Sequence, residues 1–253
     1  MALGFTAVAT AAPLDFVLQI PEDQLTPGEG AAELDGPRDI AGNPDTGHVY
    51  ITDAENARIS KYTAWGLFVK AWGWGVENGA SELQSCGPAQ PEAEPPPSLC
   101  QRGSEGSGEG QLARPNGIAV DSAGDIYVLD RLNLRVQKFS PAGEFLLMFG
   151  GKVNKTKVDE GAPAAQQNVC PLDLGDVCQA GTSGTAPSHL AGTVGNYIAY
   201  SPFDDAIVVG DKDRIQIFNL NGGFEGEIPF TGPLAAFAGQ SVNALEVDAA
   251  GNI

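Results

Sequence analysis

The chain has 253 residues, with 14 Lys and Arg against 32 Asp and Glu, which gives a formal net charge of −18 at neutral pH. Its 33 Gly and 18 Pro residues argue against helical bundles and coiled coils, whereas 42% hydrophobic residues are enough to form a core. The acidity argues against nucleic acid and anionic membrane surfaces as partners, and no apolar run is long enough for membrane insertion. We therefore expect a soluble, acidic, turn-rich all-β protein.

The amino-terminal residues 1–13 (MALGFTAVATAAP) are small and apolar, and they contain an Ala-Thr-Ala sequence that resembles a signal-peptidase site. The segment lacks a basic start and its apolar run is short. It is therefore either the end of a signal peptide or an unstructured leader. The remainder, 14–253, is expected to form the folded segment.

The segment 112–150 has the pattern of four short strands separated by turns. It contains, in order, the motifs PNGIAVD (115–121), DIYVLD (125–130), RVQKF (135–139) and GEFLLMFG (143–150). The continuous apolar run 126–129 predicts a strand that is covered on both faces. After a glycine turn, Phe145, Leu147 and Phe149 are expected to share one face of the fourth strand.

Three further segments repeat this pattern: 34–75 well, 189–230 loosely, and 240–253 in part. Repeated four-stranded units of about 40 residues are typical of β-propeller blades. The units resemble NHL repeats, whose pattern is Pro-x-Gly-Ile-Ala-Val-Asp, then Tyr-Val-x-Asp, then Arg-Val-Gln-x-Phe. The resemblance, to a bacterial secreted or surface type with Cys-containing insertions, implies a propeller used as a binding platform. We expect about three complete blades, with partial first and last blades, in an incomplete ring.

Two Gly- and Pro-rich insertions, 76–111 and 151–188, separate the copies and carry no convincing strand. They hold all four cysteines, two in each: Cys86, Cys100, Cys170 and Cys178. We favour a disulfide within each insertion over free thiols or metal ligands, because neither His48 nor His189 lies at a zinc-ligand spacing. Disulfides in turn indicate an extracellular or cell-surface location.

An Asp near the end of the second strand and an Arg at the start of the third recur between copies. The residues concerned are Asp53, Arg58, Asp130, Arg135 and Arg214. Recurrence favours a structural role for them, because an active site is usually unique within the ring. The sequence shows no nucleophile with a neighbouring base and no metal-ligand set, so we predict no catalytic, cofactor-binding or metal residues. We expect no cofactor, and the alternative is a bound calcium ion or another divalent cation.

Trp65 and Trp74 are candidate ligand-contact aromatics, whereas Trp72 aligns with Phe149 and is expected in the core. We therefore expect a non-catalytic extracellular scaffold that binds a protein or carbohydrate partner through loops on one face, above all the two insertions. The alternatives are a metal-dependent propeller enzyme, such as a lyase or lactonase, and a structural fragment of a longer surface repeat protein. Exposed blade edges would favour self-association.

Overall fold

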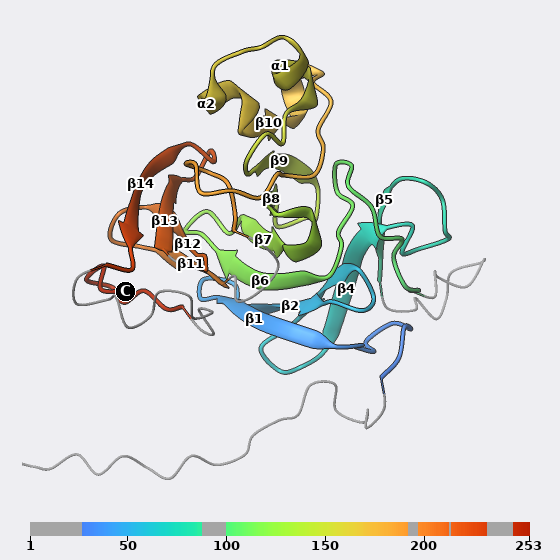
Figure 1. Cartoon of the computed structure of the whole chain (residues 1–253). Coiled ribbons are helices and arrows are strands. Elements are labelled where there is room, and N and C mark those ends of the chain that lie inside the picture. The colour runs from blue at the N-terminus through green and yellow to red at the C-terminus, as the bar shows by residue number, and fades with distance from the viewer. Residues whose placement is uncertain (1–26, 88–99, 192–196, 213, 232–244) are drawn as a thin grey trace, which may run out of the picture.

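The computed structural model describes residues 27–87, 100–191, 197–212, 214–231 and 245–253 (Figure 1). Within these residues the chain forms three antiparallel sheets and two short α-helices, so the predicted all-β class is confirmed. The sheets follow the first three copies in chain order, as the blades of a β-propeller do. The leader proposed at 1–13 lies outside the described residues.

Sequential strands pair with one another in all three sheets. The first sheet consists of β1 (Pro37–Asn43), β2 (His48–Asp53), β3 (Arg58–Tyr62), β4 (Phe68–Trp74) and β5 (Leu83–Cys86). The second consists of β6 (Pro115–Val120), β7 (Ile126–Asp130), β8 (Arg135–Phe139), β9 (Phe145–Phe149) and β10 (Val169–Pro171). The third consists of β11 (Tyr197–Ser201), β12 (Ala206–Gly210), β13 (Arg214–Asn219) and β14 (Phe224–Pro229). Short 3-10 turns occupy Arg131–Asn133 and Leu172–Leu174.

The insertions contain regular structure that the sequence did not predict. In the first, β5 pairs with β4, and in the second, β10 pairs with β9. The second insertion also forms the short helices α1 (Lys155–Asp159) and α2 (Ala164–Gln167). The expectation of strand-free loops at 76–111 and 151–188 is therefore wrong, because the outer edges of β4 and β9 need hydrogen-bond partners and the adjacent chain supplies them. No described helix is long and apolar enough to cross a membrane.

The middle sheet is covered on both faces, and β1, β6 and β11 lie side by side (Figure 1). Along β7, Ile126 and Val128 enter the core that is shared with the first sheet, whereas Tyr127 and Leu129 enter the core shared with the third. The predicted two-sided burial of 126–129 is confirmed. Each fully buried side chain of this size stabilises the fold by about 1.5–3 kcal/mol.

The strand β9 departs from simple alternation. A β-bulge in its pairing with β8 sets Phe145 opposite Phe139 but Leu147 opposite Lys138. Phe145 therefore packs toward the first sheet, whereas Leu147 and Phe149 pack toward the third. The prediction that these three side chains share one face is wrong, because the extra residue of a bulge reverses the alternation.

The described part of the fourth copy, 245–253, forms a turn and no strand. The Asp248 carboxylate accepts hydrogen bonds from the N–H groups of Ala250 and Asn252, at 2.9 Å each. Asp121 makes the same pair of hydrogen bonds at the corresponding turn between β6 and β7. The repeated aspartate therefore closes a tight turn at both positions, and at Asp121 this turn joins the paired strands β6 and β7.

Candidate binding cleft between the two insertions

A buried Asp–Arg pair lies beside the turn between β7 and β8. Asp130 and Arg135 are fully buried, and Arg135 Nε donates to Asp130 Oδ2 at 2.9 Å. The carboxylate also accepts from the N–H of Ala113 at 2.8 Å and from the amide of Asn133 at 2.9 Å. The two opposite charges thus balance each other inside the protein, and several hydrogen bonds offset the cost of their burial.

Arg135 also joins the two insertions. Its Nη2 donates to the carbonyls of Gly108 and Gln111 in the first insertion, at 2.8 Å each. Its Nη1 donates at 3.2 Å to the carbonyl of Gln179, which follows Cys178 in the second insertion. One buried guanidinium therefore binds backbone carbonyls of both insertions. It can do so because a guanidinium carries five N–H donors in a rigid planar arrangement.

The first and third sheets each contain an arginine that corresponds to Arg135 and pairs with an aspartate. Arg58 Nε lies 2.8 Å from Asp53 Oδ2, and both side chains are fully buried. Arg214 lies 3.5 Å from Asp211 and 2.6 Å from Glu227, so the loosest copy has a modified pair. Both arginines also donate to backbone carbonyls of the segment before their sheet. The structure thus places the recurring Asp and Arg residues in the framework of the blades.

Each insertion contains one disulfide bond. Cys86 is bonded to Cys100 and Cys170 to Cys178, and no described cysteine is free. Cys86 ends β5 and Cys170 lies in β10, so each disulfide ties a loop to the outermost strand of its sheet. The loop 170–178 thereby has fewer conformations available than an open loop of the same length.

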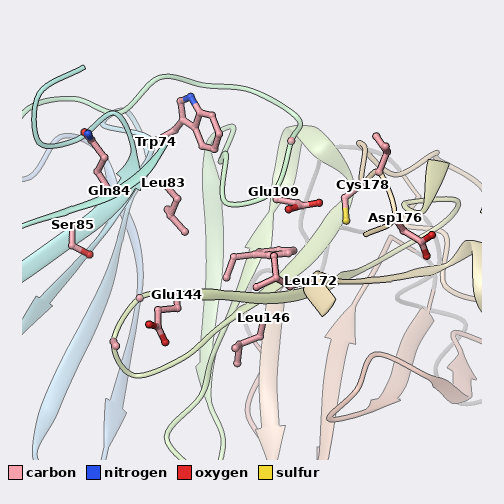
Figure 2. A pocket seen from close by; sticks show the side chains of 15 residues that line it. Trp74, Leu83, Gln84, Ser85, Glu109, Glu144, Leu146, Leu172, Asp176 and Cys178 are labelled. Atoms are coloured by element: carbon pink, nitrogen blue, oxygen red, sulfur yellow. The ribbon is translucent and has the colours of Figure 1, made fainter. Parts of the chain in front are cut away.

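A cleft of about 870 Å³ lies between the outer edges of the first and second sheets, where the two insertions face each other. One wall is formed by the end of β4 and by β5, with Trp74 and Leu83 (Figure 2). The other is formed by the turn before β9 and the loop 170–178, with Leu146 and Leu172. This volume falls within the range of roughly 300–1,000 Å³ that is typical of ligand sites.

The loop 170–178 exposes large apolar side chains at this cleft. Leu172, Leu174 and Val177 are 53%, 66% and 58% exposed, and Leu172 and Val177 line the cleft. Exposed apolar side chains gathered at one place are typical of interaction sites. These residues were not predicted from the sequence, although three apolar residues within one short Cys-closed loop are the signal that points to them.

Three carboxylates line the cleft, and they differ in their partners. Asp176 accepts from the Asn154 amide at 2.8 Å and lies 3.7 Å from the Lys157 ammonium. Glu144 lies on the turn between β8 and β9 and accepts a hydroxyl hydrogen bond from that turn. Glu109 is half-buried and takes part in none of the ion pairs of the described residues. None of these carboxylates was singled out from the sequence.

Asn154 begins an Asn-Lys-Thr sequence that matches the pattern for N-glycosylation. Its side chain caps α1 by accepting from the Lys157 N–H at 3.0 Å, and its amide donates to the carbonyl of Val169 and to Asp176. The residue is 1% exposed. Its amide is therefore inaccessible to a glycan in the folded chain and instead connects α1 to the loop that lines the cleft.

The three tryptophans have different environments. Trp72 is fully buried, with its ring centroid 6.0 Å from that of Tyr50, which agrees with its predicted place in the core. Trp74 lines the cleft. Trp65 is 76% exposed on the turn between β3 and β4, outside the cleft. Of the two candidate ligand-contact aromatics, the structure brings Trp74 to the cleft and leaves Trp65 apart from it.

A second cleft, of about 580 Å³, lies among the inner strands β1, β6 and β11. Asp39, Asp121 and Glu246 line it. Burial raises the pKa of the Asp39 carboxyl, which accepts from the Ile118 N–H at 2.9 Å and so connects β1 to β6. Among the described residues, no group of three or more His, Cys, Asp and Glu side chains is arranged to hold a metal ion.

Comparison with known families identifies two repeats in the chain. A family model described as NHL repeat matches residues 34–62 and 112–139, which lie in the first and second sheets. The chain therefore contains two segments that match NHL repeats, and the resemblance is confirmed for these two copies.

Curated relatives each match a short part of the chain. The chain is 58% identical over 43 residues to E3 ubiquitin-protein ligase TRIM71 of Rattus norvegicus, 54% identical over 44 residues to Protein lin-41 of Caenorhabditis elegans, and 43% identical over 51 residues to Protein brain tumor of Drosophila melanogaster. These matches cover 17%, 17% and 20% of this chain. The chain spans only 5%, 4% and 5% of the length of those proteins.

Solved structures resemble the chain over a larger part of its length. Hydrazine synthase of Kuenenia stuttgartiensis aligns with a TM-score of 0.40 and 11% identity, over 82% of this chain and 38% of that chain. A streptogramin B lyase aligns with a TM-score of 0.33 and 15% identity, over 79% of this chain and 57% of that chain.

Proposed function

We propose that this chain is a non-catalytic β-propeller segment that binds a protein partner in the cleft between its two insertions. The observation that carries the proposal is a cleft bounded by two disulfide-closed insertions, with Leu172 and Val177 exposed at its wall. Loops on a rigid scaffold commonly carry recognition. The apolar part of the lining consists mainly of three leucines, Val177 and Trp74. It favours a protein over a carbohydrate, whose hydroxyl groups need many hydrogen-bonding partners.

The test is the selection of binders from a displayed library of random peptides on the folded chain. Leu172→Asp should abolish binding of the selected peptides, because it places a charge in an apolar wall. Leu67→Asp is the matched control, since Leu67 is 64% exposed and does not line the cleft. Peptides that bind the Leu172→Asp chain as tightly as the unaltered chain would place the binding surface elsewhere, and a selection that yields no binder would refute the proposal.

We also propose that the protein acts outside the cytoplasm, in secreted or surface-attached form. The two disulfides support this location, because disulfide bonds persist in oxidising compartments. Thiol alkylation under denaturing conditions, applied directly to the source cells, should leave all four cysteines unlabelled. Labelling of the cysteines in protein extracted without reductant would contradict the proposed location.

A further inference from the structure

Among the carboxylates of the cleft, Glu109 is the one that pairs with no cation of the described residues. The Asp176 carboxylate lies 3.7 Å from the Lys157 ammonium, and the Glu144 carboxylate is attracted electrostatically by the Lys70 ammonium. Glu109 lines the cleft and forms no ion pair with any described residue. A purely apolar ligand would remove water from this carboxylate without replacing it, which costs free energy. The cleft therefore favours a ligand that brings a cation.

The backbone on both sides of Glu109 is held by buried groups. The carbonyl before it accepts from Arg135 at 2.8 Å, and the N–H after it donates to Gln137 at 3.0 Å. Arg135 does not neutralise Glu109, because its guanidinium is already paired with Asp130 at 2.9 Å. The protein thus presents an uncompensated negative charge from a fixed backbone.

The chain around the cleft adds more negative charge. In the first insertion, 76–111, Arg102 is the single basic residue. The described part of the same insertion contains four glutamates: Glu77, Glu82, Glu105 and Glu109. The loop 170–178 contains Asp173 and Asp176 and neither Lys nor Arg. Charge complementarity therefore selects a basic partner and disfavours an acidic one.

The apolar walls and the carboxylate together match one kind of side chain. Figure 2 shows Glu109 between Trp74 and Leu83 of one wall and the loop 170–178 of the other. We propose that this cleft takes an arginine or lysine side chain from a basic, apolar peptide segment of the partner. Its aliphatic stem lies against Trp74 and Leu83, and its cation binds Glu109. A guanidinium can also donate two parallel hydrogen bonds to a carboxylate and stack on an indole, so arginine binds more tightly than lysine.

This inference rests on the proposed binding function, so its test separates charge from apolar contact. Three fluorescent peptides of equal length alternate Leu with Arg, with Gln or with Glu, and their affinities are measured by fluorescence anisotropy. The Arg peptide should bind most tightly and the Glu peptide should not bind. Glu109→Gln should weaken binding of the Arg peptide about tenfold and leave the Gln peptide unchanged. Glu105→Gln is the matched control, because Glu105 is exposed in the same insertion and does not line the cleft.

The outcomes distinguish the two proposals. If the Gln peptide binds as tightly as the Arg peptide, and Glu109→Gln alters neither while Leu172→Asp abolishes both, the cleft binds peptides without recognising a cation. That result overturns the inference and leaves the proposed function intact.

A different outcome contradicts both proposals: the Arg peptide binds, and Leu172→Asp does not change its affinity. If none of the three peptides binds, the inference is wrong, and the library selection decides the proposed function separately. Unchanged thermal unfolding midpoints for both glutamate variants establish that each is folded.

Discussion

At the scale of the residue, Arg135 connects the core of a blade to the surface beside it. Its guanidinium is paired with a buried aspartate and also donates to carbonyls in both insertions. A lysine could not replace it, because an ammonium group lacks the planar fork that reaches acceptors in several directions. The buried Asp130–Arg135 pair is therefore connected by hydrogen bonds to both insertions that border the cleft.

Replacing Arg135 by methionine should destabilise the protein strongly. The change leaves the fully buried Asp130 carboxylate without its counter-charge, so we expect the free energy of unfolding to fall by about 3–5 kcal/mol. Urea denaturation measures the loss. Arg114→Met is the matched control, because Arg114 pairs with Glu55 at the surface and should contribute less than about 1 kcal/mol. If both variants lost the same free energy of unfolding, burial would not be what makes the Asp130–Arg135 pair important for stability.

At the scale of the element, a glycine in a turn of one sheet packs against an aromatic side chain of the preceding sheet. A Cβ atom at Gly143 would lie 2.9 Å from the Trp72 ring, and one at Gly222 would lie 2.7 Å from Phe149. Both glycines have a positive φ, 85° and 79°, which other residues rarely adopt. The contact recurs between the first and second sheets and between the second and third, so these turns set how closely neighbouring blades pack.

Gly143→Ala should therefore be more costly than the same change at an open turn. Gly161 provides the comparison, because its φ is 67° and nothing lies within 4 Å of the added Cβ. We expect Gly161→Ala to cost about 1 kcal/mol from backbone strain alone. Gly143→Ala should cost about 1–3 kcal/mol more, from displacement of the Trp72 ring. Urea unfolding followed by tryptophan fluorescence measures both, and equal costs would contradict the packing role of this turn.

At the scale of the whole molecule, the net charge of −18 governs which partners can approach. Nucleic-acid binding depends on phosphate contacts from clustered Lys and Arg, and the chain has only 14 such residues against 32 acidic ones. We predict no binding to single-stranded RNA or duplex DNA tighter than about 10⁻⁴ M at physiological salt. Fluorescence anisotropy with labelled oligonucleotides checks this, and a saturable curve that weakens with added salt would refute it.

Much of the blade architecture could be predicted from local pattern. The apolar run 126–129 indicated a strand buried on both faces, and the recurring motifs indicated repeated four-stranded units. The bulge at Phe145 could not be predicted, because it depends on how β9 pairs with β8 and not on residue type. The strands β5 and β10 also escaped prediction, because they form only where an edge strand already offers unpaired backbone groups.

The sequence by itself determined the repeat, the fold class and the acidity, because these follow from the spacing of apolar, turn and charged residues along the chain. Only the tertiary structure decided where recognition can occur. Trp74, Glu109 and Leu172 lie far apart in the sequence, and they meet because two insertions fold back over the edges of neighbouring sheets. A cleft is a property of the space between segments, so it exists only once long-range packing has brought those segments together.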